Sequence, residues 1–397
     1  MFTDDIILRI VYFIFIFCLE LVAREFHVAT YNVENLFDLK HDGNEYEEYI
    51  PFSKSGWNKQ MLEKKLLSLS QVLQDLNADI ISLQEVENQN ALALLNEKLG
   101  TNKYPYVFVP DDSSNIKTTL LSRFPILFSK ALHVKNFSRP IYQVKVQVDE
   151  KILTIFLNHW PSYKNGLESR LAYAKELEKS LHNAGEYLII GDFNAPFNVQ
   201  ENLWGKSLEE LKKRSYNLWY ELPFSQRYSH SFFKSKKALD HIFVSFLMFD
   251  GKNIEYKKGS FRVFKPDYLL DENGNTKRWS ISQKGKGKHL GVGVSDHLPL
   301  IASFETKNYT KTVPKKTTIK ELLKQNDGVV DLVLERVKVQ KVEKYGVYIE
   351  DDSHARIFIY RPDFDMKEKE VYSLHVKNLG TYKGRKEITL ASQISRF

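Results

Sequence analysis

Six short stretches within the first 304 residues end an apolar run with side chains that can bind metal ions or transfer protons. The stretches are TYNVEN, SLQEVEN, FLNHW, IGDFNA, ALDH and SDH. The polar residues that they supply are Asn32, Glu85, Asn158, His159, Asp192, Asn194, Asp240, Asp296 and His297. Carboxylates brought together repel each other and are costly to remove from water unless a cation lies among them. A hard divalent metal removes that cost and polarises a phosphoryl oxygen, so this set is suited to phosphate-ester chemistry.

Each stretch taken alone has a simpler interpretation. Asn32 at the end of a strand is typical of a turn, Glu85 is typical of a solvated carboxylate, and His159 could be a packed imidazole. Glu34 and Glu87, beside the motifs, are expected to be solvated. Six such endings in one region are not explained by turns, and we therefore expect the polar groups to converge on one rim of an apolar scaffold.

The spacing of apolar residues predicts the elements that place these motifs. Strands are expected at 26–37, 78–88, 104–110, 118–128, 141–149, 151–162, 186–196, 238–245 and 289–304, and helices at 57–77 and 169–185. The mixed order predicts an α+β sandwich, with two sheets and the helices outside. Successive side chains of a strand face opposite sides, so the neighbours Asp296 and His297 should not be partners. Asp240 should instead hydrogen-bond the His297 ring.

The composition fits a soluble globular chain of more than one domain. The 397 residues are 43% hydrophobic and 27% charged, which supports a sizeable core. The net charge is +7 and the sequence pI is about 9.0, a balance that favours anionic partners such as nucleic acid.

The first 23 residues differ from the rest. IVYFIFIFCL (10–19) is an unbroken apolar run that ends before Leu21–Val22–Ala23. It is too short to span a membrane as a helix and predicts a secretory signal peptide, although Asp4 and Asp5 depart from the usual positive charge. An uncleaved anchor, a mis-assigned start and a lipoprotein signal are the alternatives. We expect an exported protein, secreted or periplasmic, with no stable membrane span after the signal is removed.

The single cysteine limits the possible metal ligands. Cys18 lies inside the apolar run, so a processed chain has no disulfide and no thiolate site. A bound metal must then be held by oxygen and imidazole, which points to Mg²⁺, Mn²⁺ or Ca²⁺ rather than structural zinc.

The composition changes after Phe304. Residues 306–316 are polar and basic, as in a linker, and 317–397 contain short predicted strands at 329–341, 346–360, 371–384 and 387–391. This pattern resembles a small all-β barrel of the oligonucleotide/oligosaccharide-binding (OB) type. Tyr348 and Tyr360 alternate with isoleucines, so one face could stack bases. The alternative is that these aromatic residues form the barrel core.

The six motifs, in this order over residues 26–304, resemble the endonuclease/exonuclease/phosphatase superfamily. The resemblance implies a four-layered α/β-sandwich that cleaves phosphate esters with a divalent metal. It implies metal ligands at Glu85, Asn32 and Asp296. Asp192 and Asn194 would position the attacking water and the phosphate. His159 would hydrogen-bond the phosphate, and His297, oriented by Asp240, would be a general base or would polarise the phosphate.

Within the superfamily, LNHWPSY with Arg170 downstream resembles secreted bacterial nucleases, although Tyr163 and Lys164 depart from their pattern. Arg123, Arg170 and the basic segment 251–289 are expected substrate contacts. We predict a signal peptide (1–23), a catalytic domain (24–305), a linker (306–316) and an OB-like nucleic-acid-binding domain (317–397). The predicted function is a monomeric, metal-dependent endonuclease of low specificity, acting on DNA, with RNA left open. The alternative is a phosphatase or a sphingomyelinase-like phospholipid phosphodiesterase of the same superfamily.

Overall fold

The computed structural model describes residues 24–162, 166–182, 184–197, 206–232, 235–307, 314–362 and 364–397. The predicted signal peptide with Cys18, and the departures at Tyr163 and Lys164, lie outside the described residues. Among the helices of the described ranges, none is both long enough and apolar enough to cross a membrane.

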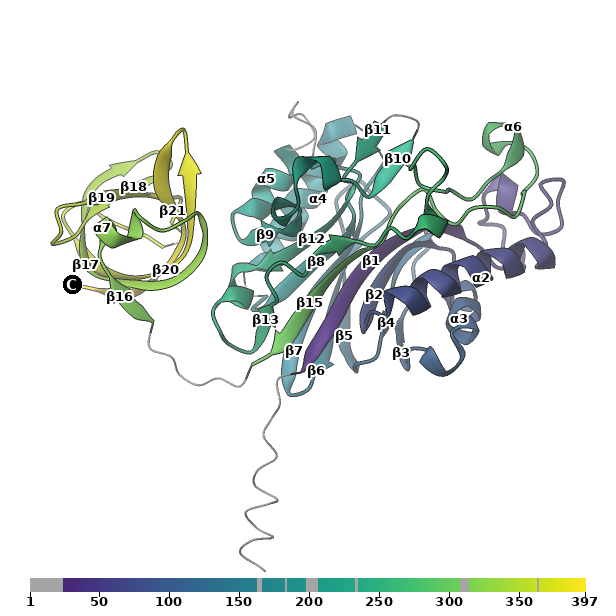
Figure 1. The fold of residues 1–397 in the computed structure, drawn as a ribbon, viewed down its shortest axis with the longest axis horizontal. Helices are drawn as coiled ribbons and strands as arrows, with labels where there is room; N and C mark the ends of the chain where they lie inside the picture. Colours follow the sequence, from purple (N-terminus) through teal and green to yellow (C-terminus); the bar gives the residue numbers. More distant parts are fainter. Residues whose placement is uncertain are drawn as a thin grey trace, which may run out of the picture.

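Two mixed β-sheets form the centre of the first domain (Figure 1). The first sheet has the order β13 (Ile254–Tyr256), β15 (Leu300–Thr306), β1 (Glu25–Leu36), β2 (Ile80–Val86), β4 (Lys117–Ser122) and β3 (Tyr106–Phe108), and β14 (Arg262–Val263) pairs with β15. The second has the order β5 (Ile126–Leu132), β6 (Ile141–Val148), β7 (Lys151–His159), β8 (Tyr187–Asp192), β12 (Asp240–Ser245) and β9 (Ser215–Asn217). A separate hairpin joins β10 (His230–Phe232) to β11 (Ser235–Lys237).

Helices cover the outer face of each sheet. α2 (Lys59–Leu76) and α3 (Gln89–Lys98) lie on the first sheet, and α4 (Gly166–Leu181) and α5 (Lys206–Lys212) lie on the second. Asn58 is the N-cap of α2, and its side-chain oxygen accepts hydrogen bonds from the backbone N–H groups of Gln60 and Met61 in the first turn. The shorter helices are η1 (Glu47–Tyr49), η2 (Gly100–Asn102), η4 (Leu218–Glu221), η5 (Phe224–Gln226), η6 (Phe246–Phe249), η7 (Asp267–Leu269) and α6 (Ser282–Gly285). The predicted four-layered sandwich is confirmed.

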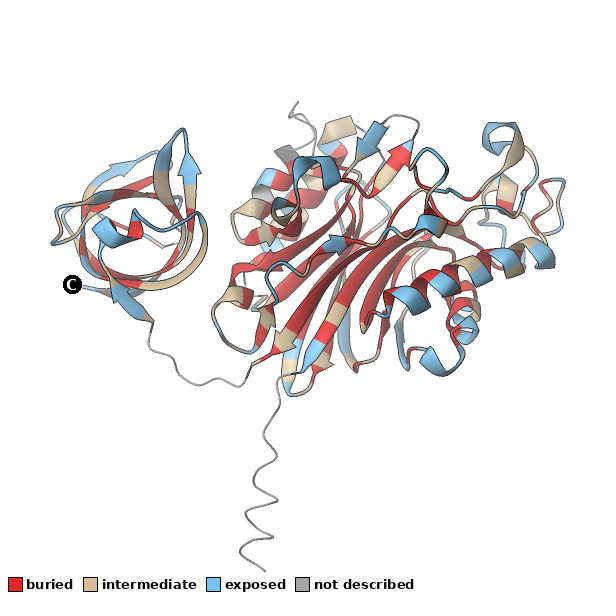
Figure 2. Ribbon diagram, in the orientation of Figure 1, coloured by how far each residue is buried: buried red, intermediate tan, exposed pale blue. Residues whose placement is uncertain are grey.

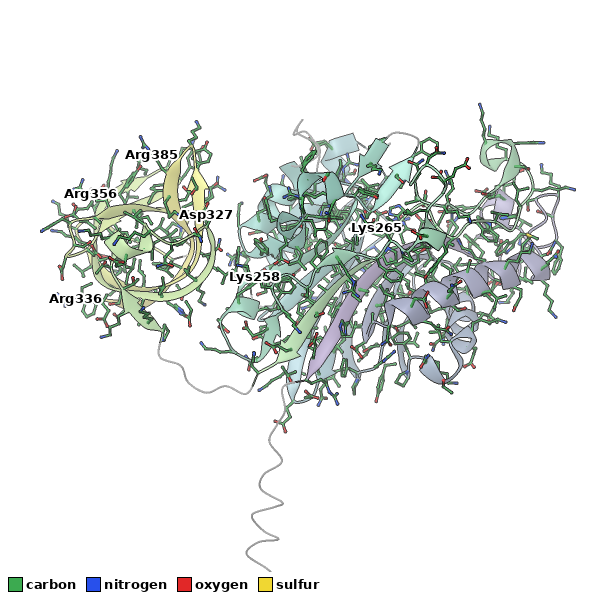
Figure 3. The ribbon with its side chains drawn as sticks, in the orientation of Figure 1. Lys258, Lys265, Asp327, Arg336, Arg356 and Arg385 are labelled. Carbon is green, nitrogen blue, oxygen red and sulfur yellow. The ribbon has the colours of Figure 1, made fainter. Side chains whose placement is uncertain are left out.

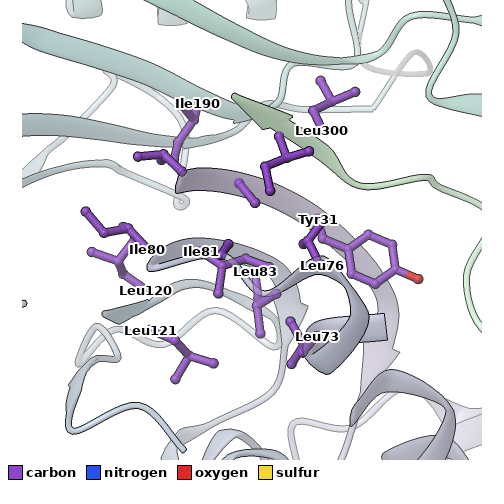
Figure 4. Close-up of a cluster of buried hydrophobic side chains, with 14 of the residues drawn as sticks. Tyr31, Leu73, Leu76, Ile80, Ile81, Leu83, Leu120, Leu121, Ile190 and Leu300 are labelled. Atoms are coloured by element: carbon purple, nitrogen blue, oxygen red, sulfur yellow. The ribbon is translucent and has the colours of Figure 1, made fainter. Parts of the chain in front are cut away.

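The apolar runs of the central strands are explained by burial on both faces. Along β7, Ile155 and Leu157 face the core between the sheets, whereas Phe156 between them packs under α4. Strands covered on both sides read as continuous apolar runs, and Figure 2 shows the central strands buried along their length. Figure 4 draws part of the larger core, to which α2, β1, β2, β4, β8 and β15 contribute.

Three predicted strands must be corrected. The one expected at 346–360 in the C-terminal domain is two strands, β18 (Gly346–Glu350) and β19 (Arg356–Tyr360). The expected strand 118–128 is two strands, β4 and β5, separated by a turn at 123–125. The expected strand 289–304 begins only at Leu300, because Gly291 and Gly293 have positive φ values of 66° and 91° and the chain before β15 is a loop. A Cβ at Gly293 would lie 1.8 Å from the carbonyl oxygen of Arg278, so this close approach requires glycine.

The C-terminal residues form a closed five-stranded barrel. Its strands are β17 (Gly328–Glu343), β18 (Gly346–Glu350), β19 (Arg356–Tyr360), β20 (Val371–Tyr382) and β21 (Arg385–Arg396), and α7 (Ile319–Leu322) packs against its core. The strands follow the order β17-β18-β19-β21-β20 and β20 closes on β17, as expected of an OB-type barrel. β16 (Lys315–Thr317) pairs with β17, so the last residues of the predicted linker belong to the sheet.

Candidate active site

The motif residues meet at one edge of the sandwich. β1 and β2 are parallel, with Asn32 beside Gln84, and β7 and β8 are parallel, with His159 beside Asp192. β12 runs antiparallel to β8 and begins where β8 ends, which sets Asp240 beside Asp192. A cleft of about 830 Å³ opens at this edge, and its lining includes Glu85, His159, Asp192, Asn194, Asp296 and His297. The expected convergence on one rim is confirmed.

Asp240 and His297 form a buried pair. Asp240 Oδ2 lies 2.7 Å from His297 Nδ1, whereas Asp296 comes no closer than 3.9 Å, to Nε2. Burial opposes the charged ring, but the Asp240, Asp192 and Asp296 carboxylates outweigh it and raise the pKa of His297 well above its ordinary value. The prediction that Asp240, and not Asp296, is the partner of His297 is therefore confirmed. The two neighbours separate because they lie in the loop before β15, and not because a strand alternates its side chains.

Asn32 joins two of the carboxylates. Its amide nitrogen donates to Glu85 Oε1 at 2.9 Å and to Asp192 Oδ2 at 3.2 Å. Its side-chain oxygen accepts the Glu34 backbone N–H at 3.0 Å. These hydrogen bonds show that Asn32 holds Glu85 and Asp192 in place. Its predicted role as a metal ligand stays a prediction, because the side-chain oxygen accepts only one of these bonds and has a second lone pair.

Asp192 has the electrostatic character of a proton acceptor near neutral pH. Burial and the nearby Asp240 carboxylate raise its pKa to about 7, against the lowering effect of His297. The Asn194 backbone N–H donates to Asp192 Oδ1 at 2.8 Å, and the Asn194 side chain donates to Oδ2 at 3.2 Å. Gly191, the residue before Asp192, approaches β7 so closely that a Cβ at this position would lie 1.9 Å from the Asn158 carbonyl oxygen. Only glycine fits there.

His159 is the second histidine of the cleft. Its Nε2 lies 3.8 Å from Glu85 Oε1 and 3.8 Å from Asp192 Oδ2. Burial, followed by the charges of Arg139 and His297, lowers the pKa of His159 well below its ordinary value. The two histidines therefore differ in charge, with a neutral ring at 159 and a protonated one at 297.

Glu34 is buried, contrary to the expectation that it is solvated. It accepts two hydrogen bonds from the Arg278 guanidinium, at 2.6 and 3.0 Å, and one from the Trp279 backbone N–H at 2.7 Å. Beneath it, the fully buried Lys65 ammonium donates to the Val33, Glu34 and Val294 carbonyl oxygens at 2.6–3.0 Å. Lys65 thereby ties the end of β1 to the loop that carries Asp296 and His297. Glu87 is also buried and accepts the Asp38 backbone N–H.

Several site residues adopt a strained backbone. Glu34, Asn35, Glu85 and Asn194 have φ values of 49°, 62°, 67° and 46°. Non-glycine residues rarely occupy this left-handed region, at a cost of about 1 kcal/mol or more each. Strain of this kind clusters at functional sites, and here it turns the chain at the strand ends so that neighbouring side chains reach one cleft.

The oxygen donors of the cleft fit a hard divalent cation. Burial and then the charge of Asp296 raise the pKa of Glu85, because a second negative charge nearby disfavours the ionised form of a buried carboxyl. Asn35, whose backbone N–H donates to Glu85 Oε2 at 3.1 Å, has a buried side-chain oxygen with no hydrogen-bond partner in the described part of the chain. Glu85, Asp296 and Asn35 could therefore supply the oxygen ligands that Mg²⁺, Mn²⁺ or Ca²⁺ prefer.

Two predicted substrate contacts must be corrected. Arg123 follows β4 at the opposite end of the sheet, where its guanidinium donates to Asn77 Oδ1 at 2.7 Å. Arg170 is fully buried in α4 and donates to the Ser162 carbonyl oxygen at 3.3 Å. Neither side chain lines the cleft. The basic segment 251–289 does reach it, through Arg278.

Sequence reasoning missed several cleft residues, among them Arg139, His230 and Tyr46. Arg139 Nη1 donates to the His159 carbonyl oxygen at 3.3 Å, so the guanidinium lies beside the histidine motif. Arg139 precedes Pro140 and a predicted strand, which is a weak signal. His230 lies in a run without a recognisable motif, and only the fold brings it beside His297.

The buried His241, which follows Asp240 in β12, should make the stability of the fold sensitive to acid. Burial lowers its pKa to about 4, and its ring nitrogens contact the Asn217 side chain and the Ala195 carbonyl oxygen at 3.1 and 2.9 Å. Because the folded pKa lies below the ordinary value, this contribution to stability is present above pH 6.5 and is lost as the pH falls toward 4. The expected loss between pH 7 and 5 is about 2 kcal/mol.

The measurement is urea unfolding at pH 7 and 5 of the wild type and of His241→Gln, whose amide offers the same donor and acceptor. The variant should lose about 2 kcal/mol less than the wild type between the two pH values. Equal losses in both proteins would contradict this role of His241.

The barrel carries its predicted aromatic residues on the outside. Tyr348 and Tyr360 point away from the core, which is formed by Val347, Ile349, Ile357 and Ile359 among others. The Tyr348 ring lies 4.9 Å from that of Phe358, its cross-strand partner. The alternative that these aromatics form the barrel core is therefore wrong.

Comparison with known proteins was made for the sequence and the fold. Residues 27–306 match the model of the Endonuclease/Exonuclease/phosphatase family. No curated protein sequence matches the chain. Among solved structures, a family protein from Bacteroides thetaiotaomicron is 18% identical, with a TM-score of 0.46 over 72% of this chain and 99% of that one. D. rerio TDP2 complexed with single strand DNA product is 14% identical, with a TM-score of 0.48 over 71% and 99%. At these values the likenesses do not extend to function.

Proposed function

The chain belongs to the endonuclease/exonuclease/phosphatase family, which accounts for residues 27–306, and from this we propose that it is an exported, metal-dependent nuclease that cleaves DNA at internal phosphodiester bonds with low sequence specificity. The observation that carries the proposal is the cleft in which the buried Asp240–His297 pair faces Asp192, Glu85 and His159.

The residues of the chain divide the reaction between two sides of the phosphate. Asp192, with a pKa of about 7, takes the proton from the attacking water, because a base near the working pH is the most effective. Asn194 fixes the Asp192 carboxylate and orients that water. His297, protonated and held by Asp240, donates from Nε2 to a phosphoryl oxygen on which negative charge develops. His159, neutral and beside Glu85, hydrogen-bonds the phosphate from the other side.

A divalent metal, proposed to be Mg²⁺ or Mn²⁺, would be held by Glu85 and Asp296 with the Asn35 oxygen, and Asn32 would keep Glu85 in place. When bound, such an ion supplies charge neutralisation at the phosphoryl oxygens. A bound cation would also offset the repulsion between the Glu85 and Asp296 carboxylates in the cleft.

A polymeric substrate is favoured by cations around the cleft and by the barrel. Arg139 and Arg278 line the cleft, where guanidinium groups suit backbone phosphates. On the barrel, Arg336, Arg356 and Arg385 lie on the outer surface (Figure 3), and the exposed Tyr360 has the Arg361 guanidinium 5.5 Å from its ring centroid. Exposed aromatic and basic residues together are typical of surfaces that stack nucleobases.

The test compares substrate classes. Residues 24–397 with Mg²⁺ or Mn²⁺ would be given double-stranded DNA, single-stranded RNA, a small phosphate monoester and sphingomyelin vesicles. Cleavage of DNA well above the other substrates is expected. Faster release from the monoester or from the vesicles would replace the proposal with a phosphatase or a phospholipid phosphodiesterase, and faster cleavage of RNA would correct its substrate.

We expect the barrel to contribute to the affinity for DNA and not to the turnover rate at the cleft. Replacing both Tyr348 and Tyr360 by alanine is expected to raise the KM for long DNA by about tenfold or more, because a stacked base is worth about 1–3 kcal/mol. The kcat should not change. Tyr106→Ala, an exposed tyrosine of β3, is the matched control. An unchanged KM in the double variant would remove the barrel from the binding surface.

Export is proposed from the sequence of residues 1–23. Expression of the full chain in a bacterial host should yield a protein outside the cytoplasm whose N-terminal residue is Arg24, as mass spectrometry of the purified product would show. A product that keeps Met1 would contradict the cleavage.

A further inference from the structure

His230 is a cleft residue to which the proposed reaction assigns no task. It begins β10 and pairs with His297 in an isolated antiparallel bridge, and the Leu298 backbone N–H donates to the Ser229 carbonyl oxygen at 2.6 Å. The two imidazole rings lie 5.1 Å apart between centroids. The backbone thus holds two histidines as cross-strand neighbours beside Asp296.

Three donor atoms converge at this point. His230 Nε2 lies 3.8 Å from Asp296 Oδ2, His297 Nε2 lies 3.9 Å from Asp296 Oδ1, and the three donors all lie within 4.8 Å of one another. A tetrahedral ion with ligand bonds of about 2.1 Å separates its donors by roughly 3.4 Å. The two histidine–carboxylate distances exceed this value by about 0.5 Å or less, which side-chain rotation can close.

The ring nitrogens are available for such an ion. His297 uses Nδ1 for Asp240, so Nε2 is the nitrogen at which a metal would replace the proton, an arrangement in which a carboxylate orients a metal-binding imidazole from behind. His230 Nδ1 is buried and has no hydrogen-bond partner among the described residues.

We propose that His230, Asp296 and His297 form a second metal site, selective for imidazole-binding divalent transition metals such as Zn²⁺, whose occupation inhibits the enzyme. Two imidazoles and one carboxylate favour Zn²⁺ over Mg²⁺, which prefers oxygen ligands. Arg278 lies 3.9 Å from Asp296 and opposes the cation, but its charge is already shared with Glu34. A metal at this site takes His297 Nε2 and Asp296 away from the phosphate. The binding claim is independent of the proposed function, whereas the inhibition claim rests on it.

Metal binding is tested first, without substrate. Co²⁺, a spectroscopic substitute for Zn²⁺, should give the strong visible absorption of a four-coordinate site in residues 24–397, and Zn²⁺ should abolish it. His230→Gln should bind Zn²⁺ at least tenfold more weakly, while His182→Gln, at an exposed histidine directly after α4, should bind as the wild type does. Far-ultraviolet circular dichroism establishes that each variant is folded. Equal Zn²⁺ affinity in His230→Gln and wild type would overturn the site.

Inhibition is tested next, on DNA cleavage at constant Mg²⁺. The Zn²⁺ concentration that halves the rate should rise at least tenfold in His230→Gln relative to the wild type. If His230→Gln loses Zn²⁺ affinity but is inhibited at the same concentration, the site exists and its inhibitory role is wrong. If no protein cleaves DNA while Co²⁺ and Zn²⁺ bind as described, the proposed function fails and the metal site stands.

Discussion

Replacing His297 by alanine is expected to lower the kcat for DNA cleavage by about 10²- to 10⁴-fold, the usual contribution of a positioned acid or base. The imidazole is the group that the buried Asp240 carboxylate orients at 2.7 Å and that the surrounding carboxylates keep protonated. Because the lost interaction is one that strengthens as charge develops on the phosphate, kcat should fall while KM changes little. Initial rates on a short duplex at saturating Mg²⁺ measure both.

Two further variants make this result specific. Asp240→Asn keeps the shape of the pair but removes its charge, and should give a smaller fall in kcat together with an altered pH profile. His182→Ala, at an exposed position directly after α4, should have the activity of the wild type. A wild-type kcat in His297→Ala would remove this residue from the reaction, and equal losses in all three variants would point to an effect on folding.

Replacing Glu85 by glutamine is expected to cost about 10²- to 10³-fold in kcat, which is the scale of losing one preorganised group that stabilises transition-state charge. Glu85 is held by Asn32 and by the Asn35 backbone N–H, and the charge of Asp296 is near enough to raise its pKa. The Mg²⁺ concentration for half-maximal rate should also rise, because a neutral amide binds a hard cation less well than a carboxylate does.

The readout is a Mg²⁺ titration of the cleavage rate in Glu85→Gln and in Glu97→Gln, an exposed carboxylate at the end of α3 that serves as the control. Wild-type Mg²⁺ dependence in Glu85→Gln would show that this residue does not hold the metal. A raised Mg²⁺ requirement in both variants would show an effect of net charge rather than of the site.

The layers of the fold could be predicted because the spacing of apolar residues along the chain indicates which faces of a helix or strand are buried. β7 and β8 read as continuous apolar runs since both faces are covered, and α2 shows its buried stripe at helical spacing. The pairing of Asp240 with His297 could be predicted because both residues belong to motifs, ALDH and SDH, that the superfamily resemblance identifies. The loop before β15 was read as a strand because alternating apolar residues do not reveal that Gly291 and Gly293 have positive φ.

The remaining site residues depend on long-range packing that no local pattern contains. Arg123 and Arg170 looked like substrate contacts because arginine near a motif is a local signal, yet one lies at the far end of the sheet and the other is buried. Glu34 was expected to be solvated, and only the folded chain shows that it is buried beside the cleft above the buried Lys65. Arg139 lies in the loop before β6, Asn35 lies near the end of β1 and His230 begins β10, and only the packing of the strands brings all three to the cleft.

The central claim is that the cleft formed by Glu85, Asp192 and the Asp240–His297 pair hydrolyses DNA with a divalent metal. The most direct measurement is the conversion of supercoiled plasmid to nicked and linear forms by residues 24–397, with Mg²⁺ or Mn²⁺, with EDTA, and beside His297→Ala. The account predicts nicking by the wild type with metal, none with EDTA, and a rate at least 10²-fold lower in the variant. Intact plasmid in the wild-type samples with every metal, or equal nicking by His297→Ala, would contradict it.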